Sequence, residues 1–172
     1  MPTTKSKTKS KRRPSVAKNS KLRRARKTAR PSPPGKPGPV NDWVELRQSP
    51  IHGLGGFARR DIAKGERIIE YTGEKIDNRE SLKREIKYLK DGHIWCFKLN
   101  RLYVRDGAVG GNVSRFINHA CKPNCYTQVV GQTIWVRAAR NIREGEELTY
   151  DYSTDGEKTI PCRCRPGCKT KL

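Results

Sequence analysis

Large apolar side chains are almost absent before residue 41, and this limits where a hydrophobic core can form. Before Trp43, the first aromatic residue, the chain holds 7 of its 11 prolines and almost no large apolar residues. Burial there cannot offset the entropy lost on ordering the backbone. We therefore expect residues 1–40 to form a disordered tail, and the folded part to begin near Asn41.

Positive charge is concentrated in the same tail. Residues 1–40 carry 14 Lys and Arg and no acidic residue, which leaves 38 − 14 = 24 basic against 17 acidic residues in the remainder. Such a tail predicts non-specific, salt-dependent binding to nucleic acid. The sequence has no apolar run long enough for a membrane span and no signal-peptide stretch, so we expect an intracellular protein without a membrane partner.

Short runs of strand-forming residues, separated by glycine turns, predict a mainly β domain. The two runs on either side of Gly131-Gln132 should form a hairpin. The strand-like runs are 43–47, 67–72, 94–98, 102–104, 127–130 and 133–138.

One helix is predicted between these strands. Asp77 can cap its start, with Glu80 as the partner in a capping box, and Asp91-Gly92 should end it. Its apolar positions recur at helical spacing and form one stripe. The stripe consists of Leu82, Ile86 and Leu89.

The cysteines favour metal binding. In an intracellular protein, metal ligation or free thiols are expected more often than disulfides. Cys162, Cys164 and Cys168 are close enough in sequence to bind zinc together, and a structural zinc normally takes four ligands. Either Cys121 or Cys125 could supply the fourth. So short a segment cannot form a core, so we expect it to fold only around the metal.

Three further segments carry residues that suggest a ligand site. Residues 115–125, RFINHACKPNC, place an Asn-His pair among apolar residues, where polar groups need hydrogen-bond partners. Residues 145–152, GEELTYDY, place two tyrosines on one extended strand. In residues 49–58, SPIHGLGGFA, three glycines would let a ligand approach the backbone. Taken singly, each has a plain structural explanation: a satisfied turn, packed tyrosines or an ordinary loop.

In this order and spacing, the motifs make residues 43–172 resemble a SET domain followed by a post-SET segment. The resemblance implies short β-sheets, one short helix and a zinc-bound C-terminal flap, with the Asn-His and tyrosine segments threaded together as a pseudoknot. It divides the chain into the tail (1–40), the SET domain (41–155) and the post-SET zinc segment (156–172).

The resemblance also implies transfer of methyl groups from S-adenosylmethionine to a protein lysine. Its implied zinc ligands are Cys121, Cys162, Cys164 and Cys168, which would leave Cys96 and Cys125 as free thiols. Its implied cofactor-binding residues are His52, Gly53, Leu54, Gly55, Trp95, Arg115, Phe116, Asn118 and His119.

The attacking lysine must be neutral, and deprotonating an amine of pKa ~10.4 near pH 7 costs roughly 4 to 5 kcal/mol. An apolar channel and the sulfonium charge would both lower that pKa. We expect the Tyr152 hydroxyl beside the reacting methyl and amine, Tyr71 lining the channel, and Tyr150 hydrogen-bonded to the amine. In the family, tyrosine at the position of Tyr150 goes with mono- and dimethylation.

The expected substrates are histones or histone-like DNA-associated proteins, so we expect the protein at chromatin or a nucleoid, in its own cell or in a host nucleus. Residues 25–30, ARKTAR, resemble a histone-tail methylation context, which makes Lys27 a candidate automethylation site. One alternative is a catalytically inactive chromatin- or DNA-binding protein that works through its tail, and another is a SET enzyme that acts on a non-histone target such as a ribosomal or metabolic protein. Retention of Tyr71, Asn118, His119 and Tyr152 favours the enzyme.

Overall fold

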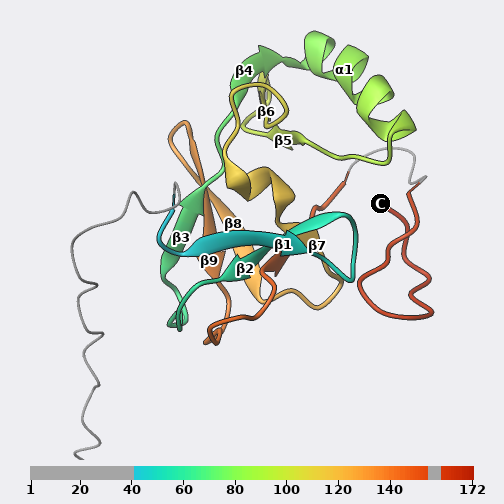
Figure 1. Ribbon diagram of the computed structural model, residues 1–172. Helices are drawn as coiled ribbons and strands as arrows, with labels where there is room; N and C mark the ends of the chain where they lie inside the picture. The colour runs from blue at the N-terminus through green and yellow to red at the C-terminus, as the bar shows by residue number, and fades with distance from the viewer. Residues whose placement is uncertain (1–40, 155–159) are drawn as a thin grey trace, which may run out of the picture. The chain divides into compact units, whose positions relative to one another are not determined.

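The structure is a computed structural model that describes residues 41–154 and 160–172 (Figure 1). The predicted mainly β class with one short helix is confirmed. The predicted disorder of residues 1–40 concerns a segment outside the described residues. The elements are β1 (Val44–Gln48), β2 (Leu54–Ala58), β3 (Arg67–Glu70), β4 (Glu74–Asp77), α1 (Asn78–Lys90), β5 (Cys96–Lys98), β6 (Tyr103–Asp106), the 3-10 helix η1 (Val113–Phe116), β7 (Asn118–His119), β8 (Cys125–Val130), β9 (Thr133–Ala138) and β10 (Thr149–Tyr150).

The strands form small separate sheets. Strands β1 and β2 pair as an antiparallel ribbon, β3-β9-β8 and β4-β6-β5 are antiparallel three-stranded sheets, and β10 pairs with β7 in parallel. The hairpin predicted around Gly131 is present, because Val130 faces Thr133 across a two-residue turn. The sequence analysis missed β2, since its glycine-rich sequence was interpreted as a loop.

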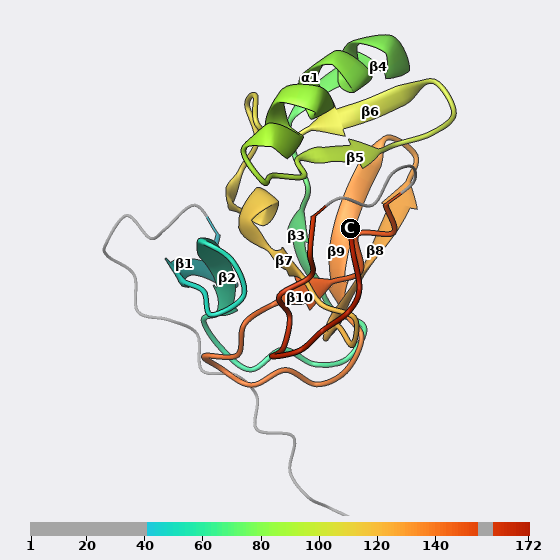
Figure 2. The same cartoon turned by 90° about the vertical axis from the view of Figure 1, so that its right-hand side faces the viewer.

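The core lies between the ribbon and the β3-β9-β8 sheet. Its largest fully buried side chains come from separate elements and loops, and the chain segments at Ile62 and Ile142 also bridge through their backbones. These residues are Ile62, Ile117, Ile134, Ile142, Leu148 and Val136. Figure 2 shows that α1, β4, β5 and β6 lie together at the top of the view, above the β3-β9-β8 sheet.

Helix α1 begins and ends as predicted. The Asp77 carboxylate accepts a hydrogen bond of 2.8 Å from the Glu80 backbone N–H, and Asp91 follows the last helical residue. The Glu80 carboxylate pairs with Lys83 and Arg84 and does not complete a capping box. In the described part of the chain, no helix is both long and apolar enough to cross a membrane.

The apolar stripe of α1 faces away from the core. Leu82 is 63% exposed and Ile86 60% exposed. The helix is attached instead through polar side chains. The fully buried carboxylate of Asp106 accepts hydrogen bonds from Arg84 (2.8 Å) and from the Tyr88 hydroxyl (2.9 Å).

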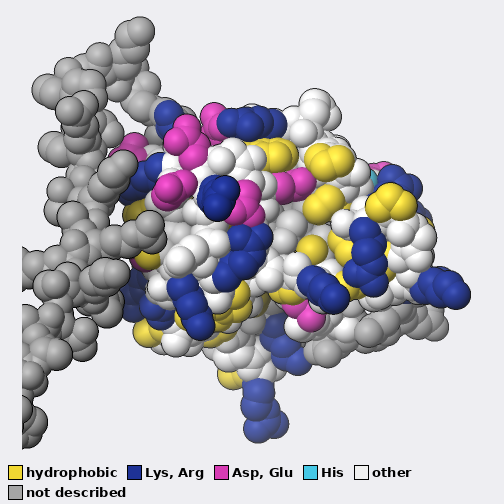
Figure 3. Space-filling model, turned by 90° about the horizontal axis from the view of Figure 1, so that it is seen from below, with side chains coloured by type: hydrophobic (Ala, Val, Ile, Leu, Met, Phe, Trp, Pro, Cys, Tyr) yellow, Lys and Arg dark blue, Asp and Glu magenta, His cyan; other side chains and the backbone are white. Residues whose placement is uncertain are grey.

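Strands β7 and β10 bring two distant motifs side by side. Asn118 pairs with Thr149 and His119 with Tyr150, which are about thirty residues later in the chain. The C-terminal residues 160–172 fold back on themselves, since Ile160 and Leu172 exchange two backbone hydrogen bonds. On the molecular face in Figure 3, lysine and arginine side chains are interspersed with acidic ones.

Candidate functional site: two joined cavities and a cysteine cluster

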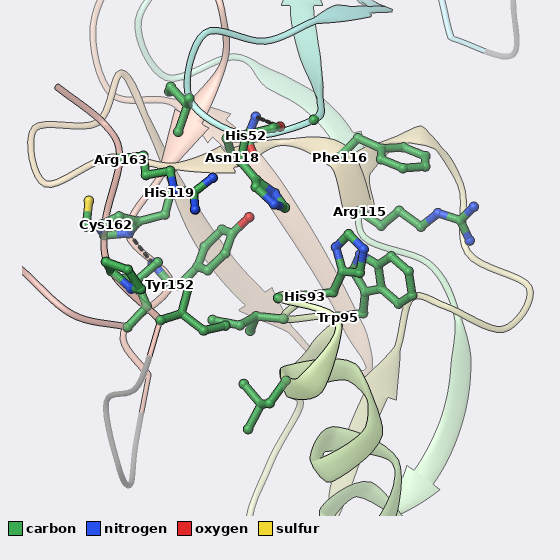
Figure 4. Close-up of a pocket in the computed structure, with 18 of the residues that line it drawn as sticks. His52, His93, Trp95, Arg115, Phe116, Asn118, His119, Tyr152, Cys162 and Arg163 are labelled. Carbon is green, nitrogen blue, oxygen red and sulfur yellow. Dashed lines mark hydrogen bonds between the residues drawn. The ribbon is translucent and has the colours of Figure 1, made fainter. Parts of the chain in front are cut away.

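A cavity of about 690 Å³ lies between the β1–β2 turn, the segment leading into β5, the η1–β7 segment and the C-terminal residues (Figure 4). We call it the first cavity. It gathers all but one of the predicted cofactor-binding residues. Those that line it are His52, Gly53, Leu54, Trp95, Arg115, Phe116, Asn118 and His119.

Gly55 is the exception, because it does not line the first cavity. It lies against a buried contact instead: a Cβ added at Gly55 would overlap Glu147 Oε1 and lie 2.9 Å from Ser49 Cβ. The glycine is therefore required for close packing inside the fold. Gly53 lines the cavity with a φ of +47°, a left-handed conformation that favours glycine.

The Asn118 side chain ties the β1–β2 turn to the strand that carries the tyrosines. Its Nδ2 donates to Glu147 Oε1 (2.9 Å), to Ser49 Oγ (3.1 Å) and to the carbonyl oxygens of His52 (3.3 Å) and Leu54 (3.2 Å). The Ser49 hydroxyl also donates to Glu147 Oε1 at 2.7 Å. Because Nδ2 faces these acceptors, Oδ1 is the atom left to accept from a ligand.

Sequence reasoning missed Ser49 and Glu147, although both lie inside the quoted motifs. They are 98 residues apart. Hydroxyl and carboxylate side chains at such a separation give no pairing signal in one sequence. Their contact becomes evident only when the β1–β2 turn and β10 are folded together.

Aromatic and cationic side chains form another wall of the first cavity. The Trp95 ring stacks on His93 with centroids 4.3 Å apart, and the Arg115 guanidinium lies 4.7 Å from the Phe116 ring centroid. Arg115 Nε is buried and has no hydrogen-bond partner in the described part of the chain. The pKa of His52 is lowered by burial, and further by His93 and Arg163. His52 is therefore neutral at pH 7.

A second cavity, of about 570 Å³, lies beside the first. The two cavities share a wall, because Tyr152 lines both, as do Leu89, His93, Ile94 and Leu172. The predicted channel residues Tyr71 and Tyr150 line the second cavity. Phe97 also lines it and contacts both tyrosine rings, at centroid distances of 5.4 and 6.1 Å. No motif marked Phe97 in the sequence.

The three tyrosine hydroxyls have different surroundings. Tyr71 donates to the Trp95 carbonyl (2.7 Å) and Tyr152 to the Ile117 carbonyl (3.0 Å). The Tyr150 hydroxyl has no hydrogen-bond partner among residues 41–154 and 160–172, so it is free to bind a ligand in the second cavity. Burial raises the pKa of all three phenols, so they are neutral at pH 7.

Four cysteine thiols meet beside the first cavity, with every Sγ within 4.8 Å of the others. Cys121 supplies the fourth thiol, since its Sγ lies 3.8 Å from that of Cys162 and 3.7 Å from that of Cys168. Tetrahedral zinc with Zn–S bonds of about 2.3 Å separates its sulfurs by about 3.8 Å. The donor set therefore fits zinc. Cys125 is fully buried outside the cluster.

His119 connects the cysteine cluster with the tyrosine strand. Its Nε2 lies 3.6 Å from Cys121 Sγ, and its Nδ1 accepts a hydrogen bond of 3.3 Å from the Tyr152 backbone N–H. Cys162 and Arg163 line the first cavity directly. A substitution in the cysteine cluster would therefore alter the wall of the first cavity.

The β7–β10 pairing, the joined cavities and the cysteine cluster together define the class of the protein. The family model for the SET domain matches residues 53–153, and the chain belongs to this family. It is 45% identical over 130 residues to the histone-lysine N-methyltransferase trithorax of Drosophila melanogaster, an alignment that covers 72% of this chain and 4% of that protein.

Two other relatives give the same result. Identity is 40% over 139 residues with the "Histone-lysine N-methyltransferase, H3 lysine-4 specific" of Yarrowia lipolytica, covering 75% of this chain and 12% of that one. It is 42% over 130 residues with human histone-lysine N-methyltransferase 2B, covering 70% and 5%. The chain thus spans only a small part of the length of these relatives.

Proposed function

We propose that the protein is a protein-lysine methyltransferase that uses S-adenosylmethionine. The observation that carries this proposal is a pair of cavities that share a wall containing Tyr152, one lined by polar and aromatic groups and the other by tyrosines. The donor molecule would occupy the first cavity and the substrate lysine the second. The names of the relatives, which are histone-lysine methyltransferases, support the same activity.

The first cavity suits a nucleoside-bearing sulfonium. When bound, S-adenosylmethionine supplies an electrophilic methyl group on positively charged sulfur. Asn118 Oδ1 would accept a hydrogen bond from a ligand ammonium, and Arg115 and Phe116 would form an adjacent part of the wall. The Trp95 face offers stacking to a planar ring. The neutral His52 adds no charge that would repel a sulfonium.

In the second cavity the tyrosines would position the amine. Their raised pKa values keep the phenols protonated, so they orient the amine by hydrogen bonds and do not remove its proton. The apolar ring walls of Tyr71 and Phe97 disfavour a charged ammonium and so lower the pKa of the lysine. Tyr152, at the junction, would lie beside the transferred methyl.

Tyr150 would limit the number of methyl groups added. Its hydroxyl, which has no hydrogen-bond partner in the described part of the chain, would hydrogen-bond the amine and occupy space that a further methyl needs. The expected products are therefore mono- and dimethyl-lysine.

The cysteine cluster would hold a structural zinc ion. The metal would fix residues 160–172, whose Cys162 and Arg163 line the first cavity. We further propose that the SET domain spans residues 41–155 and the zinc segment residues 156–172.

The expected substrates are histones or histone-like basic proteins, and residues 1–40 would bind nucleic acid without sequence specificity. Both expectations favour a chromatin or nucleoid location. Lys27, in the tail, would be an automethylation site. A Lys27→Arg protein should incorporate less label into itself; undiminished incorporation would refute this site.

The decisive test combines purified protein, radiolabelled S-adenosylmethionine, and a panel of histones and basic peptides. Wild-type protein should label a lysine, identified by mass spectrometry, and Tyr152→Phe should reduce the rate at least about 100-fold. Tyr126→Phe, on exposed β8, is the matched control and should keep the rate. Salt-sensitive DNA binding without any methyl transfer would favour the inactive, tail-dependent alternative.

A further inference from the structure

Glu85 is a carboxylate on the wall of the second cavity, and it lies outside all the sequence motifs. One face of α1 forms this wall, and Glu85 lies at its middle. The side chain is only partly exposed to solvent. The lining residues of this face recur at helical spacing and are Asn78, Ser81, Leu82, Glu85 and Leu89.

The two basic residues of α1 just before Glu85 pair with other carboxylates, and within the described residues Lys87 and Lys90 form no ion pair with Glu85. Arg84 pairs with Glu74 (2.6 Å), Glu80 (3.1 Å) and Asp106 (2.8 Å). Lys83 pairs with Glu80 at 3.2 Å. Lys98, a basic residue that also lines the cavity, is engaged in an interaction of its own.

Glu85 therefore has no ion pair within the described residues, and its side chain contacts the neutral thiol of Cys96. Burial is the largest cause of the raised pKa of the Glu85 carboxyl group. A partly buried carboxylate without a cation carries an uncompensated desolvation cost. A cation that enters the cavity with a ligand would relieve this cost.

The residues around the carboxylate indicate which cation fits. Leu82 and Leu89 flank Glu85 on the same wall and are 63% and 39% exposed. Aliphatic surface next to one carboxylate complements the side chain of arginine or lysine, whose methylene stem packs on apolar groups while its charged end pairs with the anion. A small inorganic cation would gain nothing from the leucines.

We propose that Glu85 is a specificity-determining residue that pairs with an arginine or lysine flanking the target lysine in the substrate. This inference rests on the proposed methyltransferase function, because it takes the second cavity as the substrate site. It narrows the substrate class to lysines that lie within about three residues of a second basic side chain, the reach of an extended peptide along this wall.

The test measures kcat/KM of the full-length protein on matched peptides. Each has one lysine in an alanine and glycine background, either without a further charge or with one arginine at a position from −3 to +3. Wild-type protein should prefer the best arginine peptide over the uncharged one by about tenfold or more, the size expected for one charge-assisted hydrogen bond. Glu85→Gln should reduce this ratio to about one, and Glu85→Lys should shift the preference to a glutamate-flanked peptide.

Glu144→Gln is the control, because it makes the same change of charge at an exposed position between β9 and β10. It should keep the wild-type ratio. The inference is overturned if wild-type protein methylates all peptides equally well, or if Glu85→Gln lowers every rate by the same factor. If wild-type protein methylates none of the peptides or histones, the proposed function fails, and the inference fails with it.

Discussion

Replacing Glu147 with alanine tests whether the first cavity is held in shape by the contact between Ser49, Asn118 and Glu147. Glu147 Oε1 accepts hydrogen bonds from Ser49 Oγ (2.7 Å) and Asn118 Nδ2 (2.9 Å). These bonds connect the β1–β2 turn and β7 to the residues just before β10. Removing the carboxylate leaves Asn118 Nδ2 with Ser49 Oγ at 3.1 Å and with the turn carbonyls at 3.2 and 3.3 Å.

The expected loss follows from the number and kind of these bonds. A hydrogen bond to a charged group contributes about 1.5–3 kcal/mol, and the lower end applies here because Glu147 is only partly buried. Two such bonds give about 3 kcal/mol, or a Tm lower by about 10 °C. If half of this free energy, about 1.5 kcal/mol, is needed to order the β1–β2 turn when the ligand binds, the affinity for the methyl donor falls about tenfold.

Isothermal titration with S-adenosylhomocysteine, together with thermal melting, measures both quantities. Glu146→Ala is the matched control, because the neighbouring carboxylate pairs with exposed Arg140 and with the Arg143 backbone N–H, away from the cavity. The control should lose some stability and keep its affinity. A folded Glu147→Ala protein that binds within twofold of wild type would refute the role given to this contact.

Three further changes have defined outcomes. Tyr150→Phe removes a hydroxyl without a partner in the described residues, so Tm should change little while mass spectrometry finds more trimethyl-lysine; an unchanged product ratio would contradict the limit set by Tyr150. Zinc chelation, or Cys168→Ser, should reduce methyl transfer at least about tenfold with little change in far-UV circular dichroism, and full activity in metal-free protein would exclude the structural zinc. Asp106→Ala removes the fully buried carboxylate that accepts hydrogen bonds from Arg84 and Tyr88 and should cost about 2–3 kcal/mol of unfolding free energy in urea titrations. A loss below about 1 kcal/mol would mean that α1 is attached in another way.

The parts of the site that lie within one motif could be predicted from the sequence. The terminal cysteines are so close in sequence that joint binding of one metal ion is the simplest explanation for their spacing. Choosing Cys121 over Cys125 needed either the resemblance or the fold, because both cysteines are far from the terminal cysteines in sequence and close to each other. The fold separates them: Cys125 points into the core from β8, while Cys121 lies in the segment after β7.

Contacts between motifs could not be predicted in the same way. Gly55 shows the difference, since its lack of a side chain is compatible with close approach by a ligand or by the protein itself. In this structure the protein itself makes the close approach, because Glu147 and Ser49 fill the space next to Gly55. A glycine in a sequence indicates that space is short, and only the fold identifies what occupies that space.

Helix α1 shows how this kind of ambiguity bears on function. The spacing of Leu82, Ile86 and Leu89 correctly predicts an amphipathic helix, but periodicity does not say which face is buried. Asp106 on β6 decides which face of the helix is buried. Its buried carboxylate accepts hydrogen bonds from Arg84 and Tyr88, which lie on the side of the helix opposite the apolar stripe. A helix buried through its apolar stripe would have withdrawn Leu82 and Leu89 from solvent. Attached through its polar side chains, it keeps both leucines on the wall of the second cavity, on either side of a carboxylate that forms no ion pair within the part of the chain that the structure describes.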